Sequence, residues 1–135
     1  MESRIKIYLG IDWGTKRIGL AIGDSSTRMA SPFQVVSDLE EIVSIISYEE
    51  IDEIVIGEPL KMQDIVRDLD KSYVEFVEQL ERNVQLPIRK IDERLSSKHA
   101  DSLPGCKKTK AARDAVAAML ILQSYLDTLK RDDFM

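Results

Sequence analysis

The chain has little of what several large classes of protein require. Cys106 is its only cysteine, which excludes an internal disulfide and any paired-cysteine metal or redox motif. His99 is its only histidine, and nothing around it resembles a catalytic arrangement. No apolar run approaches the roughly 20 residues that span a membrane, and the first six residues lack the apolar region of a signal peptide. We therefore expect a cytoplasmic protein without a membrane partner.

Common phosphate-binding and nucleophile motifs are also missing. The chain contains no GxGxxG run. Residues 10–16 resemble a P-loop only superficially, because the glycine spacing is one residue short and threonine precedes the lysine. Ser96 and Ser97 lie near His99, but no nucleophile elbow surrounds them. These absences leave little support for nucleotide binding or acyl transfer.

Composition and length indicate one domain covering residues 1–135. Hydrophobic residues make up 44% of the chain, enough for a single core, and no linker or repeat divides it. The net charge is −5, from 19 Lys+Arg against 24 Asp+Glu, whereas a nucleic-acid-binding protein is usually basic. The local distribution differs, because residues 106–113 carry four cations and no acid. Lys16 and Arg17 form a second basic point.

Hydrophobic patterning predicts an α/β fold. The first three strands can form an antiparallel meander, and each later strand follows a crossover helix and should lie parallel. The result is a five-stranded mixed sheet with helices on both faces. Strands are expected at 4–12, 17–23, 28–36, 53–57 and 86–92. Helices are expected from a Ser37–Glu40 capping box to about 48, and over 64–83, 94–103 and 109–131.

Three acids carry the candidate chemistry: Asp12, Glu93 and Asp114. Asp12 ends the first strand beside a glycine turn, and alternation separates it from the most apolar face of that strand. Glu93 follows the last strand, and Asp114 heads an apolar stripe of the last helix. Each has a simpler explanation: Glu93 can pair with Arg94, Asp114 can complement a helix N-terminus, and Asp12 can be a structural acid.

Together the three acids favour a metal site. Carboxylates without a histidine or cysteine partner suit Mg²⁺ or Mn²⁺, and two such ions can activate water and stabilise the leaving oxygen of a phosphodiester. Trp13, next to Asp12, is expected either to stack on a base or to pack against the last helix. Glu58, at the end of the fourth strand, either joins the site or is a loop-end acid.

Five segments together resemble the YqgF/RuvX family, which is described as Holliday-junction-resolvase-like and as nucleases for the small-subunit ribosomal RNA precursor. The resemblance covers about residues 5–127. The segments are Gly10–Asp24, Ala30–Pro32, Ile54–Leu60, Asp92–Ser97 and Asp114–Ala118. It implies a ribonuclease H-like fold, with metal ligands at Asp12, Glu93 and Asp114. The run Lys61–Ile65 departs from the family pattern, in a loop that the resemblance implies helps to seat the nucleic acid.

The leading hypothesis is a metal-dependent endonuclease that processes the 5′ end of the 16S ribosomal RNA precursor. The alternatives are a Holliday-junction resolvase and a nucleic-acid-binding regulatory module with little or no cleavage. An actin-like ATPase is a more distant hypothesis, because those enzymes enclose a nucleotide between two such domains. Either a monomer or a homodimer is compatible with the sequence. The expected nucleic-acid contacts are Lys16, Arg17, Arg94, Lys107, Lys108, Lys110 and Arg113.

Overall fold

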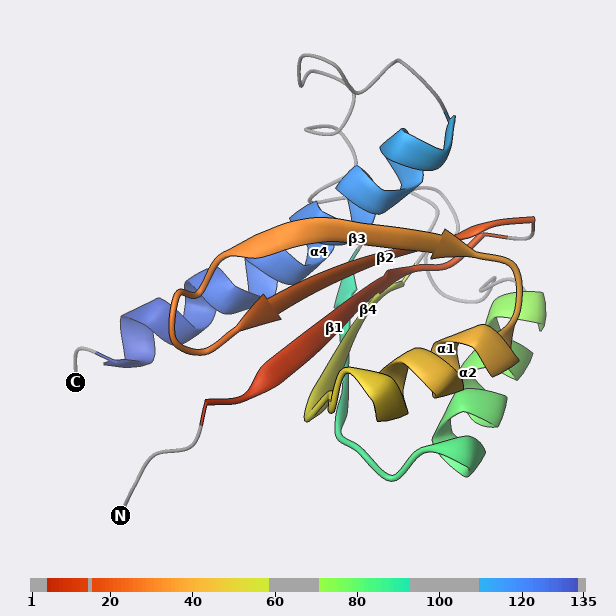
Figure 1. Cartoon of the computed structure of the whole chain (residues 1–135), viewed down its shortest axis with the longest axis horizontal. Helices are drawn as coiled ribbons and strands as arrows, with labels where there is room; N and C mark the ends of the chain where they lie inside the picture. The colour runs from red at the N-terminus through yellow and green to blue at the C-terminus, as the bar shows by residue number, and fades with distance from the viewer. Residues whose placement is uncertain (1–4, 15, 59–70, 93–109, 134–135) are drawn as a thin grey trace.

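A computed structural model describes residues 5–14, 16–58, 71–92 and 110–133. In these residues a five-stranded sheet lies between two helical layers (Figure 1). The strands are β1 (Ile7–Asp12), β2 (Ile18–Asp24), β3 (Ala30–Val36), β4 (Glu53–Glu58) and β5 (Ile88–Asp92). The helices are α1 (Leu39–Tyr48), α2 (Lys71–Asn83) and α4 (Lys110–Asp133). The predicted helix over 94–103 lies outside the described residues.

The sheet has the predicted mixed topology. Its strand order is β3-β2-β1-β4-β5, with β1, β2 and β3 antiparallel and β4 and β5 parallel to β1. The parallel strands β1, β4 and β5 therefore end at the same edge of the sheet. The first strand begins at Ile7 rather than at residue 4, because Ile5 is exposed and lies outside the ladder.

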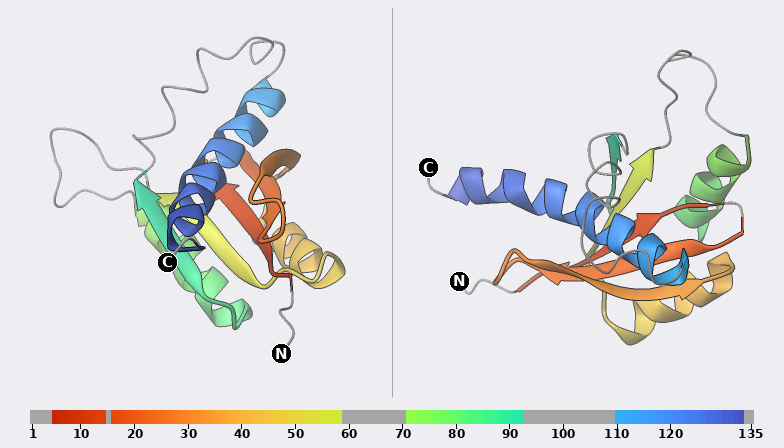
Figure 2. Two further views of the ribbon diagram at one scale, coloured as in Figure 1. Left: turned by 90° about the vertical axis from the view of Figure 1, so that its left-hand side faces the viewer. Right: turned by 90° about the horizontal axis from the view of Figure 1, so that it is seen from above.

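Helix α4 covers one face of the sheet (Figure 2). Its buried residues Ala118, Ile121 and Leu122 pack against Tyr8 and other residues of the sheet. The contact is close, because a Cβ built on Gly10 would lie 2.8 Å from the Leu122 Cβ and 3.0 Å from the Ala118 carbonyl oxygen. A glycine on β1 therefore lets the helix backbone approach the sheet directly.

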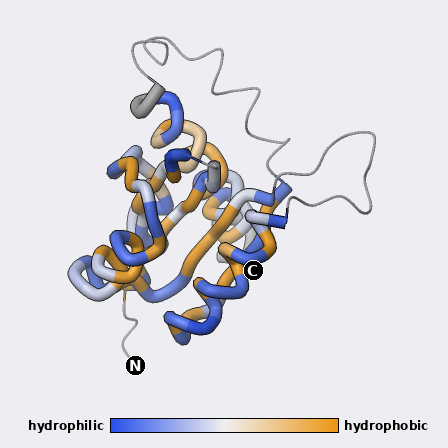
Figure 3. Tube along the Cα trace, turned by 90° about the vertical axis from the view of Figure 1, so that its right-hand side faces the viewer, coloured by the Kyte–Doolittle hydropathy of each residue, from blue (hydrophilic) through white to orange (hydrophobic). Residues whose placement is uncertain are grey.

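Helices α1 and α2 cover the opposite face, where Leu9 and Ile11 of β1 are buried. Figure 3 shows the resulting pattern, with apolar stretches along the strands and mixed segments along the helices. The capping box of α1 lies one residue later than predicted. Asp38, not Ser37, is the N-cap and accepts from the Glu41 backbone N–H, while the Glu41 side chain accepts from the Ser37 N–H. Both registers fit the motif, and the aspartate takes the cap.

Candidate metal and nucleic-acid site

Asp12 and the start of α4, which carries Asp114, lie near each other at the edge where the parallel strands end. Asp12 is the last residue of β1 and is paired directly with Gly19 of β2. Directly opposed residues of antiparallel strands point to the same face, with Cα atoms roughly 4.5–5.5 Å apart. A Cβ on Gly19 would lie 2.1 Å from the Asp114 carbonyl oxygen. The start of α4 thus lies directly over the neighbour of Asp12, on the face to which Asp12 points.

Arg17 completes this corner of the molecule. Its Nε–H donates to Oδ2 of Asp114 at 2.8 Å, across 97 positions of the chain. The Arg17 side chain is 41% exposed and that of Asp114 is 28% exposed, so the pair remains within reach of solvent. The sequence predicts Arg17 as a nucleic-acid contact and Asp114 as a metal ligand, and the structure joins the two in one ion pair.

The simpler explanation of Asp114, as a residue that complements a helix N-terminus, does not fit its position. Helix α4 begins at Lys110, and its first turn contains no acid. The macrodipole effect falls off within that turn. Asp114 instead precedes the buried positions Ala115 and Ala118, at the side of the apolar stripe. The negative charge of Asp114 is compensated by Arg17 rather than by the positive end of the helix dipole.

The donor chemistry of this corner fits a hard divalent cation. Carboxylate oxygens are the only ligand type at Asp12 and Asp114, and oxygen ligands are those that Mg²⁺ and Mn²⁺ prefer. Within residues 5–14, 16–58, 71–92 and 110–133, no group of three acidic, histidine or cysteine side chains is gathered. Glu93, the third predicted ligand, lies outside the described residues, so the structure describes two of the three predicted ligands, Asp12 and Asp114.

The predicted nucleic-acid contacts are only partly described. Lys16, in the turn after β1, and Arg113, beside Asp114, are both exposed. The backbone of Lys110 begins α4, but its side chain is not described. Arg94, Lys107 and Lys108 lie outside the described residues. Two exposed cations and Arg17 therefore flank the Asp12–Asp114 corner.

Two further acids at strand ends do not point into this corner. Asp24 ends β2, which runs antiparallel to β1, so it lies at the other end of the sheet and caps a turn by accepting from the Thr27 N–H. Glu58 ends β4 at the correct edge. Alternation from buried Val55, which packs beneath α4, places Glu58 on the opposite face, shared with Ile56. This position favours the loop-end interpretation of Glu58.

The prediction that Trp13 packs against the last helix is wrong. Trp13 packs in the other layer, with its ring centroid 5.7 Å from that of Tyr73 and 6.5 Å from that of Phe76, both on α2. Alternation explains the outcome, because Trp13 follows Asp12 and so points away from the α4 face. The tryptophan therefore anchors the end of β1 on the face covered by α1 and α2, while Asp12 lies on the face covered by α4.

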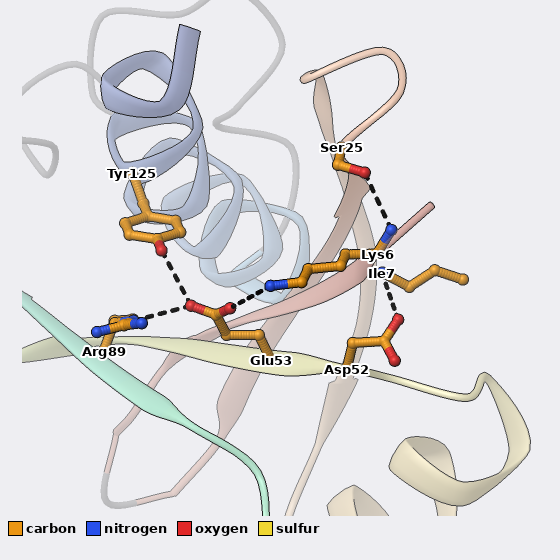
Figure 4. Close-up of polar contacts among 7 residues, drawn as sticks. All are labelled: Lys6, Ile7, Ser25, Asp52, Glu53, Arg89 and Tyr125. Carbon is orange, nitrogen blue, oxygen red and sulfur yellow. Dashed lines mark hydrogen bonds and ion pairs between the residues drawn. The ribbon is translucent and has the colours of Figure 1, made fainter. Parts of the chain in front are cut away.

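A second polar cluster, which no sequence pattern indicates, is centred on Glu53 (Figure 4). This acid is only 3% exposed. Its Oε2 accepts from Arg89 Nε at 2.8 Å and from the Tyr125 hydroxyl at 2.9 Å, and Lys6 Nζ lies 3.9 Å from Oε1. Glu53 is paired with Tyr8, four residues from Asp12 along β1, or about 13 Å at roughly 3.3 Å per residue. The cluster is separate from the candidate site.

Burial and charge shift several pKa values in this cluster. Burial raises the pKa of the Tyr125 hydroxyl, and its hydrogen bond to Glu53 raises it further. Burial also raises the pKa of Tyr8, which the negative charge of Glu53 reinforces. The hydrogen bond to Glu53 raises the pKa of Arg89. These shifts keep both tyrosines protonated and Arg89 charged, as expected of an anchor that ties α4 to β4.

Replacing Tyr125 with phenylalanine should lower the free energy of unfolding by about 1.5 kcal/mol, because a hydrogen bond to a charged, buried acceptor is lost. Urea denaturation followed by circular dichroism measures this. Tyr48, which is 85% exposed, provides the matched control, and Tyr48→Phe should leave stability unchanged. Equal stability of the two variants would contradict the assignment of Tyr125 as an anchor.

The difference in unfolding free energy between wild type and Tyr125→Phe should also depend on pH. Because the folded-state pKa of Tyr125 is raised, its stabilising contribution is present below the unfolded pKa of about 10. That contribution is lost as the pH rises through the folded pKa. The stability gap between wild type and Tyr125→Phe should therefore narrow above pH ~10. A gap that widened there would mean that the tyrosine ionises readily in the folded protein.

Comparisons with known proteins agree on one family. The family model described as "RuvX: Holliday junction resolvase" matches residues 6–128. Similar curated proteins carry the name "Putative pre-16S rRNA nuclease". That of Maridesulfovibrio salexigens is 39% identical, over 87% of this chain and 96% of its own. That of Lachnospira eligens is 34% identical, over 91% of this chain and 98% of its own.

Solved structures support the fold independently of sequence. The structure titled "T. thermophilus RuvC in complex with Holliday junction substrate" superposes with a TM-score of 0.58 at 13% identity, covering 93% of this chain and 96% of that one. A Fowlpox virus resolvase in complex with Holliday junction DNA gives 0.56 at 11% identity, covering 91% and 98%. At such low identity the likeness concerns the fold alone. It confirms the predicted ribonuclease H-like architecture.

Proposed function

Because the chain belongs to the RuvX family, whose model spans nearly all of it, we propose that it is a metal-dependent endonuclease acting on structured nucleic acid. The substrate proposed first is the precursor of 16S ribosomal RNA, cleaved at its 5′ end in the cytoplasm. The names of the relatives at 39% and 34% identity support this choice over a DNA junction. The metal-binding and catalytic residues proposed are Asp12, Glu93 and Asp114.

One observation carries the proposal: two acids from distant parts of the chain lie at the same corner of the sheet. Asp12 ends β1, and Asp114 lies over Gly19, the direct partner of Asp12. A structural acid needs no second acid beside it, since two neighbouring carboxylates repel each other. Their approach is useful to the protein when a cation is shared between them.

The residues around Asp12 and Asp114 have different proposed roles. Asp12 and Asp114 supply oxygen ligands, and Lys16 and Arg113, both exposed, attract the phosphate backbone towards them. Bound Mg²⁺ or Mn²⁺ would supply an activated water and compensate the charge of the leaving oxygen. Trp13 and its α2 partners hold the end of β1 from the opposite face, which keeps the Asp12 backbone in place.

The test is a nuclease assay with Mn²⁺ on two substrates, a 16S precursor RNA and a four-way DNA junction, with wild type beside Asp12→Asn. Cleavage of the RNA alone supports the leading proposal. Cleavage of the junction alone supports a resolvase, which needs a homodimer to cut two strands symmetrically. Light scattering on the same sample determines whether the protein is a monomer or a homodimer. Activity that persists in Asp12→Asn would contradict both.

A second candidate function follows from the Arg17 pair. Asp114 already has a cationic partner 2.8 Å away, so its negative charge is compensated without a metal ion. The chain would then be a nucleic-acid-binding regulatory module with weak or no cleavage. Binding of both substrates without cleavage in Mn²⁺, by wild type and Asp12→Asn alike, would favour this function.

Replacing Lys107, Lys108 and Lys110 with alanine should weaken nucleic-acid binding and flatten its salt dependence. Each lost phosphate contact should reduce the slope of log affinity against log salt by about one unit. Fluorescence anisotropy of labelled RNA at several salt concentrations measures the slope. The control is Lys71→Ala with Arg82→Ala, two exposed cations on α2, across the sheet from α4. An unchanged slope in the triple variant would assign the three lysines to bulk solvent.

A further inference from the structure

The backbone fixes both partners of the Arg17–Asp114 pair. A Cβ on Gly14 would lie 2.7 Å from the Arg17 carbonyl oxygen, so the turn between β1 and β2 is tight at the point that leads to Arg17. The backbone of α4 at Asp114 passes close over Gly19, because a Cβ added there would lie 2.1 Å from the Asp114 carbonyl oxygen. Ion pairs as exposed as this one contribute little to stability. The pair is therefore not needed to hold the two elements together.

The position of the pair places Arg17 in competition with a metal ion. Its Nε–H occupies Oδ2 of Asp114, one of the two oxygens that a cation could use. A divalent cation bound between Asp114 and Asp12 would also repel a guanidinium only one hydrogen bond away. The two positive charges cannot both be bound at full strength at this carboxylate.

We propose that Arg17 is a placeholder cation, which neutralises Asp114 before a metal ion binds and then moves to a phosphate of the nucleic acid. This inference rests on the metal-dependent function proposed above. The Arg17 side chain is 41% exposed, so part of it already faces solvent, where a phosphate can reach it. Arginine binds phosphate oxygens well through its forked N–H groups. Arg17 thus positions the substrate and does not itself react.

The two binding events are then coupled. A metal ion displaces Arg17 and makes it available to phosphate, and a phosphate that engages Arg17 removes the competitor from Asp114. Such coupling is reciprocal by thermodynamic necessity. The arrangement keeps metal affinity low until nucleic acid arrives, which restricts the assembled site to the substrate complex.

The test measures Mn²⁺ binding by the protein without nucleic acid. Arg17→Ala should bind Mn²⁺ about tenfold more tightly than wild type, because the competing cation is gone. Calorimetry gives the affinity, and paramagnetic broadening of amide resonances around Asp12 and Asp114 confirms where the ion binds. Arg82→Ala removes an equal charge from exposed α2, on the opposite layer, and should change the affinity less than about twofold.

Two further measurements keep the outcomes distinct. Arg17→Gln removes the charge but keeps an N–H donor, and it should also bind Mn²⁺ more tightly, so it carries the test if Arg17→Ala does not fold. Wild type that binds Mn²⁺ as tightly as both Arg17 variants would overturn the placeholder role while leaving the proposed function intact. No Mn²⁺ binding by any of these proteins, up to tens of millimolar, would overturn the metal site and the placeholder together.

Discussion

Asp12→Asn should abolish cleavage while leaving the fold and nucleic-acid binding intact. The change is nearly isosteric and removes a metal-binding charge. A metal ion contributes several kcal/mol of charge stabilisation in the transition state, so the rate should fall by about a thousandfold or more. With His99 as the only histidine, the chain has no evident second group to activate water. Initial rates on precursor RNA in Mn²⁺ measure the effect.

Asp24→Asn is the matched control for this variant. Asp24 also ends a strand of the sheet, but at the far end, where its side chain accepts from the Thr27 N–H. Asparagine can make the same cap, so both stability and cleavage should be retained. Loss of activity in the Asp24 variant would show that any strand-end acid matters, and the special position of Asp12 would no longer explain the result.

The stability of Asp12→Asn separates a functional acid from a structural one. Asp12 lies on the face that α4 covers, and Asp114 lies over Gly19, the strand partner of Asp12, so removing one negative charge should relieve repulsion between the two acids. The melting temperature should stay the same or rise slightly, as functional sites often reduce stability. A much lower melting temperature would make Asp12 a structural acid, and the metal site would lose its central ligand.

Local patterns in the sequence were enough to predict the sheet. Alternation along residues 7–12 separates the face of Leu9 and Ile11 from that of Tyr8 and Asp12, and the structure confirms this division. The order of strands and helices gave the antiparallel meander followed by parallel strands. Such patterns depend on neighbours in the chain, which is why they are legible without coordinates.

Contacts between distant residues were not predictable in this way. The Arg17–Asp114 pair spans 97 positions, and the Tyr125–Glu53 hydrogen bond spans 72. No local periodicity shows which acid will meet which cation, and Glu53 reads simply as the first residue of a strand. Alternation does reach Trp13, because it puts this residue on the face opposite Asp12, which is the face that α1 and α2 cover.

Gly19 accounts for the approach of Asp114 to Asp12, and replacing it with alanine should damage both stability and activity. The added Cβ would lie 2.1 Å from the Asp114 carbonyl oxygen, 2.4 Å from its carbonyl carbon and 3.0 Å from the Ala115 nitrogen. All three atoms belong to the backbone of α4, so no side chain can turn aside. The start of the helix must move away from β2, at a cost of about 3 kcal/mol.

The same movement should lower the cleavage rate by about a hundredfold per folded molecule, because a displacement near 1 Å is enough to spoil a reacting geometry. Gly23→Ala is the control with a milder clash, since Gly23 lies on the same face of β2 as Gly19 but far from Asp12. There the Cβ would meet the Met29 carbonyl oxygen at 2.9 Å and the tip of Leu126 at 3.1 Å. Urea unfolding and initial rates, measured on both variants, give the two effects separately. Gly23→Ala should lose less stability and keep its activity. If Gly19→Ala cleaves as well as Gly23→Ala, the position of Asp114 above Gly19 does not matter for catalysis.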